Sequence, residues 1–375
     1  MINNYSPIAK IFISIILIFI FVYGNKLNRI NNINNKLFYN ENKDINIKFK
    51  NVSVIIPVYN CEKTINYSIL SIKKQNLTNL EIILVNDFSK DNSLNIIKEF
   101  MKNDSRIKLI NNKENRGTLY SRSIGALSAK GEYIFSLDND DEFFGIDSLD
   151  YIYNQAKEGN HDIIYFRRFS IRNKSVLKLK LKKYILKNNL YNTNNRFKII
   201  NQPELSIYPI SKNMKYSPNS FFLWDKCIKT KIYQQAVKML FKDINSKNIS
   251  YNEDIIIIFI IFSISKSMKI INKLGIIHYL YNNSTARTRK YEYKIYCDIY
   301  LLDILFRFSK NNSYKNFCVD YFVSNMKFIS KNKNKENNLY LIKVLNKIII
   351  DKYITEKNKL ILKTFIKKLE DKKLN

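Results

Sequence analysis

The sequence VSVIIPVYNCEKTI, residues 52–65, opens the stretch that decides the fold, because a short apolar run passes directly into a helical pattern. Its first six residues are rich in valine and isoleucine, as expected of a strand buried on both faces. The pattern repeats, with strands expected at 81–87, 107–110, 133–137 and 162–166 and helices at 63–75, 94–101 and 119–129. This alternation predicts an α/β fold with a Rossmann-like, mostly parallel sheet flanked by helices.

Polar and aromatic residues follow the ends of these strands, which is where open α/β sheets bind their ligands. Tyr59 follows the first strand and offers a ring on which a nucleotide base can stack. Asp87 follows the second strand and offers a carboxylate to the imide N–H of uracil. Arg116 and Gly117 follow the third strand, and Arg122 lies on the next helix. These positions predict a nucleotide at one edge of the sheet.

The fourth strand ends in the acidic turn DNDD, residues 138–141. Asp138 and Asp140 have D-x-D spacing, and two carboxylates so placed can hold Mg²⁺ or Mn²⁺ against the oxygens of a diphosphate. The departure of a nucleotide diphosphate needs such a positive charge. The structural alternative is a solvated acidic turn at a strand end.

The second half of the chain has a less regular pattern. Residues 170–215 are rich in lysine and asparagine and predict a loop or insertion, on the side of the site where a second substrate, the acceptor, would bind. Order returns at 219–237, and the run IIIIFIIF at 255–262 predicts a buried helix that is too short to span a membrane. A late strand is expected at 275–281, and residues from 291 onward have a helical, lysine-rich pattern.

The N-terminus predicts a membrane association. Residues 11–23 carry no charge, so residues 1–24 are interpreted as a transmembrane anchor or a signal segment, followed by an Asn-rich stalk at 25–50. Localisation is therefore expected to be membrane-associated and single-pass. A type II arrangement, as in the Golgi or ER, and a cytosolic-facing orientation both stay open, because the flanking lysines are weak evidence in so basic a chain.

The charge of the chain is strongly positive, with 63 Lys and Arg against 32 Asp and Glu, a net +31. The lysines are spread along the whole sequence, and no nucleic-acid-binding motif appears, so no nucleic-acid partner is expected. The four cysteines are far apart and form no CxxC pair, which disfavours a structural zinc site.

Three segments carry a family resemblance: VSVIIPVYNCEKTI, EIILVNDFSKDNS and NRGTLYSRSIGALSAKGEYIFSLDNDDEF. In this order they resemble the nucleotide-binding half of family 2 glycosyltransferases, which have the GT-A fold. FLWDKCIKTKIY and YNEDIIIIF resemble, more loosely, the acceptor-side segment and the base motif of that family. The resemblance implies a catalytic domain at 51–290, with a nucleotide-binding half at 51–145 and an acceptor half at 146–290. A helical extension then occupies 291–375.

The implied activity is the inverting, metal-dependent transfer of one sugar from a nucleotide diphosphate donor, UDP rather than GDP, to an acceptor hydroxyl. The acceptor is a carbohydrate, lipid or protein. No Q-x-x-R-W motif follows Asp254, so the enzyme is expected to add a single sugar rather than a polymer. Two alternatives stay open: a polyprenyl-phosphate glycosyltransferase and an inactive sugar-nucleotide-binding protein. Retention of Asp87, Asp138, Asp140 and Asp254 together favours an enzyme.

The resemblance also implies roles for individual residues. Asp254 is the expected base and Asp138 and Asp140 the expected ligands of Mn²⁺ or Mg²⁺, with His278 as a further ligand. The expected substrate-binding residues are Pro57, Tyr59, Asn60, Glu62, Asp87, Arg116, Gly117, Arg122, Asp138, Trp224, Glu253 and Arg287.

Several of these residues have structural alternatives. Asp254 can be a helix N-cap, and His278 a hydrogen-bonded core histidine. Arg122 can contact phosphate, anchor the acidic turn or be purely structural. Trp224 can stack on the acceptor sugar or fill the core.

Overall fold

The computed structural model describes residues 50–172, 180–181, 198–201, 222–246, 248–280, 291–308, 335–351 and 354–374. These ranges all belong to one compact unit. The expected anchor or signal segment, nearly all of the stalk, most of 170–215 and Arg287 lie outside the described residues. Within the described ranges, no helix has the length and apolarity needed to cross a bilayer.

The described elements alternate between strand and helix through the first half of the chain. In order they are β1 (Lys50–Val58), α2 (Ile65–Lys73), β2 (Leu80–Asn86), α3 (Ser93–Lys102), β3 (Ile107–Asn111), α4 (Thr118–Ser128), β4 (Gly131–Ser136), β5 (Glu142–Phe143), α5 (Ser148–Glu158), β6 (Ile163–Ile171), β7 (Lys198–Asn201), β8 (Lys226–Lys229), α7 (Thr230–Met239), α8 (Phe241–Ser246), α9 (Glu253–Ile264), β9 (Ser267–Tyr279), α11 (Tyr291–Phe308), α13 (Lys335–Ile349) and α14 (Glu356–Leu374). The strands and helices predicted between 52 and 143 are confirmed to within a few residues.

The sheet is mixed, with four parallel and four antiparallel strand pairs among the described residues, and the predicted parallel pairing holds for β1 to β4 and for β6 with β9. Its strand order is β3-β2-β1-β4-β8-β6-β9-β5, and β7 pairs with β9 outside this path. The pairs β1–β2, β2–β3 and β1–β4 are parallel, as strand–helix alternation requires. Beyond β4 the four-residue β8 runs antiparallel to both β4 and β6, and β5 and β7 run antiparallel to β9.

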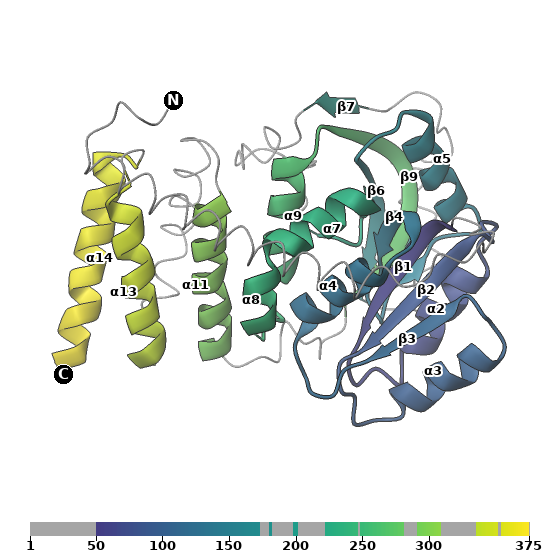
Figure 1. The fold of residues 1–375 in the computed structure, drawn as a ribbon, viewed down its shortest axis with the longest axis horizontal. Helices are drawn as coiled ribbons and strands as arrows, with labels where there is room; N and C mark the ends of the chain where they lie inside the picture. Colours follow the sequence, from purple (N-terminus) through teal and green to yellow (C-terminus); the bar gives the residue numbers. More distant parts are fainter. Residues whose placement is uncertain are drawn as a thin grey trace, which may run out of the picture. The chain divides into compact units, whose positions relative to one another are not determined.

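Alternate residues of the central strands face two different helical layers (Figure 1). On β1, Ile55 packs into the layer that contains α4, α7 and α9, whereas Val54 and Ile56 pack into the layer that contains α2, α3 and α5. All three side chains are fully buried. Burial on both faces explains why this strand reads as a continuous apolar run.

Two elements differ from the sequence-based expectation. Strand β9 begins at Ser267, well before the expected 275. The sequence did not indicate this earlier start because Lys269 and Asn272 interrupt the apolar pattern, although both side chains are buried. Helix α5 is not among the predicted elements, yet Leu149, Ile152, Tyr153 and Ala156 are buried at helical spacing. The signal for α5 was therefore present in the sequence.

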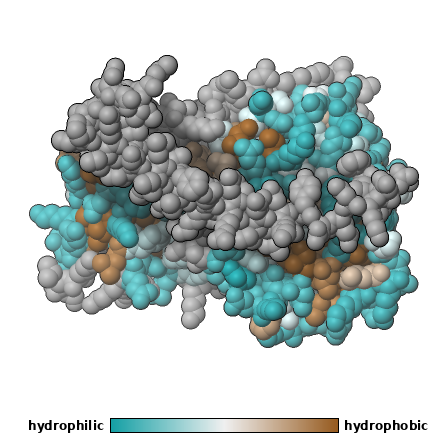
Figure 2. All heavy atoms as spheres, viewed as in Figure 1, coloured by the Kyte–Doolittle hydropathy of each residue, from teal (hydrophilic) through white to brown (hydrophobic). Residues whose placement is uncertain are grey.

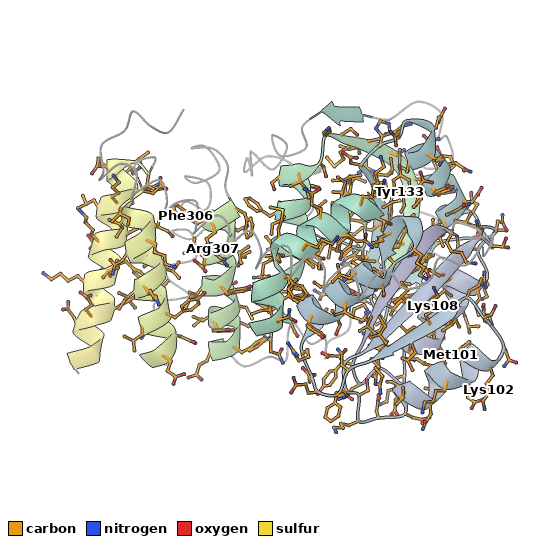
Figure 3. The ribbon with its side chains drawn as sticks, in the orientation of Figure 1. Met101, Lys102, Lys108, Tyr133, Phe306 and Arg307 are labelled. Atoms are coloured by element: carbon orange, nitrogen blue, oxygen red, sulfur yellow. The ribbon has the colours of Figure 1, made fainter. Side chains whose placement is uncertain are left out.

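The C-terminal helices pack in succession onto α9. Helix α9 contacts α11, α11 contacts α13, and α13 contacts α14. All four contribute to one apolar core, and α9 itself is apolar on every face, as expected of a buried helix. Phe306 of α11 packs against this core, and its neighbour Arg307 pairs with Asp303 (Figure 3). Figure 2 shows apolar and hydrophilic residues side by side over α13 and α14, where Leu339 and Leu360 are exposed.

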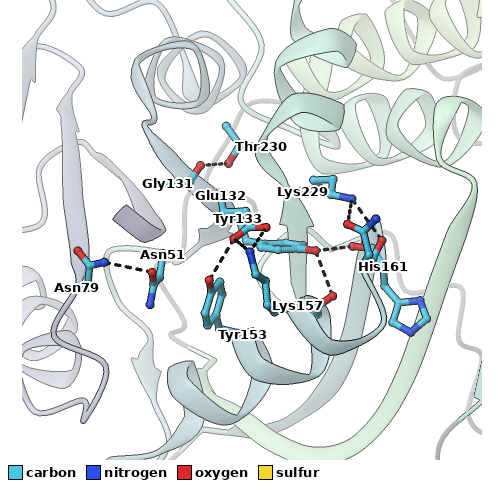
Figure 4. A network of polar contacts seen from close by, with 12 residues as sticks. Asn51, Asn79, Gly131, Glu132, Tyr133, Tyr153, Lys157, His161, Lys229 and Thr230 are labelled. Atoms are coloured by element: carbon cyan, nitrogen blue, oxygen red, sulfur yellow. Dashed lines mark hydrogen bonds and ion pairs between the residues drawn. The ribbon is translucent and has the colours of Figure 1, made fainter. Parts of the chain in front are cut away.

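A polar network holds the first residues of β4, at the end of this strand that is farther from the acidic turn in the sequence (Figure 4). The Tyr133 hydroxyl donates to the carbonyls of Ala156 and His161, which ties the strand to the end of α5. The Thr230 hydroxyl donates to the Gly131 carbonyl and joins β4 to α7. These contacts hold the strand that leads into the acidic turn.

Candidate active site

Asp87, at the end of β2, builds the loop that precedes α4. Its carboxylate accepts the backbone N–H of Arg116 at 2.8 Å, the backbone N–H of Gly117 at 2.8 Å and the side-chain amide of Asn112 at 2.9 Å. Two of these donors lie at the N-terminus of a helix, where a carboxylate is favourable. The residue predicted to read uracil is thus also a structural anchor for the 112–117 loop.

Gly117 occupies a position that only glycine fits. Its φ is +86°, and a Cβ would lie 2.5 Å from the Asn248 side-chain oxygen and 2.8 Å from the Ile249 carbonyl. The α4 N-terminus therefore approaches the segment that leads into α9. This contact brings the predicted nucleotide side and the predicted base side of the site together.

The residues after β1 fasten neighbouring loops and leave one ring at the surface. Asn60 accepts the Lys90 N–H at 2.8 Å, and Glu62 accepts the Asn92 N–H at 2.9 Å. The Pro57 carbonyl accepts the Asn139 side-chain amide at 2.9 Å, which holds the acidic turn. Tyr59 is 41% exposed and remains available to stack on a planar ligand.

The Arg116 side chain is turned toward α8 rather than toward the acidic turn. Its guanidinium lies 4.4 Å from the Tyr120 ring and donates to the Asn245 carbonyl at 2.8 Å. Arg116 therefore contributes to the nucleotide side through its backbone N–H on Asp87, and its guanidinium has protein partners.

The acidic turn gathers three carboxylates. One oxygen each of Asp138, Asp140 and Asp141 lies within 4.8 Å of the others, and this is the group of described residues that can hold a metal ion. Burial and the two neighbouring carboxylates raise the pKa of Asp140 to about 8. Such crowding of like charge among oxygen donors fits a hard divalent cation, Mg²⁺ or Mn²⁺.

Asp141 joins this turn to β9. The His278 Nδ1 lies 3.0 Å from one Asp141 oxygen, and the Tyr279 backbone N–H donates to the other at 2.9 Å. The Asp141 hydrogen bond and the surrounding acidic charge raise the pKa of His278, although burial opposes them. His278, predicted as a metal ligand, is therefore placed as a hydrogen-bonded partner of the turn.

Trp224 is enclosed between two rings. Its centroid is 4.6 Å from that of His278 and 4.9 Å from that of Phe222, and both contacts are stacked. The Trp224 side chain is 3% exposed. Of its two predicted roles, the structure places it in the core, beneath Phe222.

Arg122 connects the acidic turn with the acids of α9. This buried guanidinium pairs with Asp138 at 2.5 Å, and its Nε lies 3.6 Å from Asp254 and 3.9 Å from Glu253. The three carboxylates raise the pKa of Arg122 above its ordinary value in spite of burial. Among its alternatives, the structure shows Arg122 anchoring the acidic turn.

The two acids of α9 have different protonation tendencies. Burial and the Asp254 charge raise the pKa of Glu253 to about 8. Burial also raises the pKa of Asp254, to about 6, and here Arg122, the Leu223 backbone N–H and Lys226 oppose the rise. These three groups stabilise the charged form of Asp254 and favour it as the base of the pair, since only an ionised carboxylate can accept a proton. The N-cap position belongs to Asn252, and Asp254 lies within the first turn.

The loop before α9 is held by α11. Asn252 has a left-handed conformation with φ +59°, and its side-chain amide donates to Asp298 at 2.7 Å. The Tyr293 hydroxyl accepts the Ser250 N–H at 2.7 Å. Helix α11, the first of the C-terminal extension, thus fixes the backbone directly before the candidate base.

We expect replacement of Asp298 by leucine to lower sugar transfer about tenfold, because the Asn252 amide loses its charged acceptor, a bond of about 1.5–3 kcal/mol. Asp298→Asn keeps an acceptor oxygen at the same place and is expected to stay within about twofold of wild type. Initial rates of transfer, with donor binding measured in parallel, check this. Equal rates for Asp298→Leu and Asp298→Asn would show that α11 does not position the base.

Sequence reasoning missed three residues at this site. Asp141 was visible as the third carboxylate of the DNDD turn, and Phe222 as the aromatic that precedes Trp224 by two residues. Asp298 lies inside a lysine-rich helical segment and has no local signal, because its importance depends on the distant Asn252.

Comparison with known proteins agrees with this geometry. Residues 53–216 match the family model described as glycosyl transferase family 2. An uncharacterized glycosyltransferase of Haemophilus influenzae is 42% identical over 99 residues, which cover 26% of this chain and 39% of that protein. UDP-Glc:alpha-D-GlcNAc-diphosphoundecaprenol beta-1,3-glucosyltransferase WfgD of Escherichia coli is 35% identical over 126 residues, which cover 34% of this chain and 49% of that protein. The matched stretch thus spans less than half of either relative.

The fold is also that of a solved structure. S. aureus TarS 1–349 in complex with UDP-GlcNAc superposes with a TM-score of 0.57 at 16% identity and covers 86% of this chain and 88% of that chain. The TarS superposition shows that this chain shares the fold of that protein. The glycosyl transferase family 2 match over residues 53–216 confirms the resemblance that the sequence motifs showed in this part of the chain.

Proposed function

We propose that this protein transfers a single sugar from a UDP-sugar to an acceptor hydroxyl with inversion of configuration. The observation that carries the proposal is the Arg122 bridge, because it joins Asp138 of the acidic turn to Asp254 of α9. Residues far apart in the sequence thus meet as two acidic centres on either side of one cation. UDP is favoured by the UDP-Glc in the name of WfgD and by the UDP-GlcNAc complex of TarS.

On the donor side, the Tyr59 ring and the loop fixed by Asp87 would receive the nucleotide. Asp138 and Asp140 would hold Mn²⁺ or Mg²⁺, which supplies positive charge to the departing diphosphate. Asp141 and Arg122 keep the turn in place from its two sides.

On the acceptor side, Asp254 would remove the proton from the attacking hydroxyl. The acceptor oxygen then forms a bond to the anomeric carbon as the bond to the diphosphate breaks, and the proton ends on the Asp254 carboxylate. A carboxylate opposite the leaving group gives inversion, by the same geometry as in inverting glycoside hydrolysis. Glu253, with its raised pKa, would be the protonated partner that donates a hydrogen bond to the acceptor.

The decisive test is donor turnover by the full-length chain. UDP- and GDP-sugars are supplied with Mn²⁺, Mg²⁺ or EDTA, and nucleotide release is followed. We expect cation-dependent release from a UDP-sugar, and in Asp140→Asn a rate about 100-fold lower, since charge stabilisation of several kcal/mol is weakened. Asp150→Asn, on the first turn of α5, is a matched carboxylate control and should keep the wild-type rate. Turnover in EDTA at the wild-type rate would contradict the assigned role of Asp140.

A further inference from the structure

Three rings are stacked in a column beside the candidate base. Phe222 stacks on Trp224 with centroids 4.9 Å apart, and Trp224 stacks on His278 with centroids 4.6 Å apart. Trp224 is 3% exposed, whereas Phe222 is 43% exposed. A ligand that approaches this column therefore meets Phe222 first.

Buried charges hold Phe222 in place from below. The Lys226 ammonium donates to the Phe222 carbonyl at 2.7 Å and to Asp225 at 2.6 Å, and both of these side chains are fully buried. The Arg168 guanidinium pairs with Asp225 at 2.6 Å and lies 4.7 Å from the Phe222 ring. An exposed aromatic ring with this much support is a preorganised surface rather than a side chain left at the surface by chance.

The column also lies between the two acidic centres. The backbone N–H of Leu223, next to Phe222 in the chain, is one of the groups that lower the pKa of Asp254, which places it close to that carboxylate. At the other end of the column, His278 bonds to Asp141 of the acidic turn. Phe222 thus directly precedes a residue that neighbours the group that would accept the proton of the acceptor hydroxyl.

We propose that Phe222 is the platform on which the acceptor sugar stacks, so that the acceptor presents a pyranose ring. This inference rests on the proposed function. The C–H face of a pyranose is apolar and matches an aromatic face, while the hydroxyls at its edge are polar. A pyranose on Phe222 would direct an edge hydroxyl to Asp254. Phe222 would then determine acceptor specificity, and Trp224 would support it.

The chain contains a natural reporter for this platform. Trp224 is its single tryptophan, so the intrinsic tryptophan emission of the protein arises from the ring directly beneath Phe222. The full-length protein is titrated with methyl pyranosides of glucose, galactose and N-acetylglucosamine, in the presence of UDP and Mn²⁺. We expect at least one to change the Trp224 emission with saturation.

Phe222→Ala is expected to weaken this binding about tenfold and to raise the KM for the same pyranoside as acceptor. UDP-sugar hydrolysis without acceptor is measured in parallel, so that a change in acceptor KM is distinguished from a change in donor turnover. Phe222→Tyr keeps the aromatic face and should behave as wild type, and Phe241→Ala removes another exposed phenylalanine as a matched control. In a second arm, octyl glycosides replace the methyl pyranosides. Tighter binding of the octyl form would indicate a lipid-linked acceptor sugar, and equal binding of the two forms would indicate a free glycan.

Different results would refute the proposed sugar transfer and the Phe222 platform. Absence of donor turnover in the wild type would refute the proposed function. Normal donor turnover with no pyranoside binding, or with equal acceptor KM in wild type and Phe222→Ala, would overturn the platform and leave the transferase in place.

Discussion

Replacing Asp254 by asparagine is expected to lower sugar transfer about 1,000-fold, within the range of about 10²–10⁴ that a positioned base contributes. Asparagine has nearly the same shape but cannot accept the proton of the acceptor hydroxyl. The donor contacts at Tyr59, Asp87 and the acidic turn are untouched, so the affinity for the UDP-sugar should remain within about twofold of wild type. Single-turnover transfer rates and donor titrations measure the two quantities separately.

The matched control is Glu253→Gln, the neighbouring position on α9. Glu253 is protonated at neutral pH in our assignment, so its amide analogue should lower transfer far less than Asp254→Asn does. The wild-type rate should fall as pH drops through about 6, because protonation removes the base form of Asp254. A larger loss in Glu253→Gln would exchange the roles of the two acids, and a flat pH profile between 5 and 8 would contradict the assignment of Asp254 as the base.

The first half of the fold could be predicted because its signals are local. Strand β1 is buried on both faces, so its apolar run, and the helix that follows it, can be recognised without knowing which elements they pack against. The direction of β8 is different, since four residues carry no sign of whether they run with or against β4 and β6. Its antiparallel pairing depends on the route by which the chain returns to the sheet.

The residues of the candidate site also fall into those that the local sequence could predict and those that it could not. Asp138, Asp140 and Asp254 could be located because strand ends and a helix start are marked in the sequence. The alternatives for Trp224 could not be separated, because the rings on both of its faces come from other positions in the chain. Contacts between distant residues decide whether a side chain meets the ligand or supports the residue that does.

Among the contacts between distant residues, those of Arg122 are expected to contribute most to the stability of the fold. Replacing it by methionine is expected to lower the free energy of unfolding by about 3–5 kcal/mol at pH 8, because buried carboxylates lose their counter-charge. Asp138 lies 2.5 Å from this guanidinium, and Asp254 and Glu253 lie within 4 Å. Urea unfolding of the full-length chain, monitored by far-UV circular dichroism, measures the difference.

The pH dependence separates this electrostatic loss from a packing defect. Without Arg122, the folded-state pKa values of Glu253 and Asp254, which burial already raises, rise further above their unfolded values. The folded state then binds more protons than the unfolded state, so the stability of the variant falls as pH rises through those values. The deficit of Arg122→Met should therefore be smaller at pH 5 than at pH 8, whereas a cavity would give the same deficit at both.

Arg106→Met provides the matched comparison, because Arg106 is partly exposed and pairs with the single carboxylate Asp104 at 2.8 Å. A pair of that kind contributes about 1 kcal/mol or less. Arg122→Lys retains the charge and should recover part of the lost stability, but its single ammonium cannot reproduce the planar guanidinium between Asp138 and α9. If Arg122→Met were no less stable than Arg106→Met, the bridge would be dispensable for folding, and its geometry would have to serve the substrate-bound state alone.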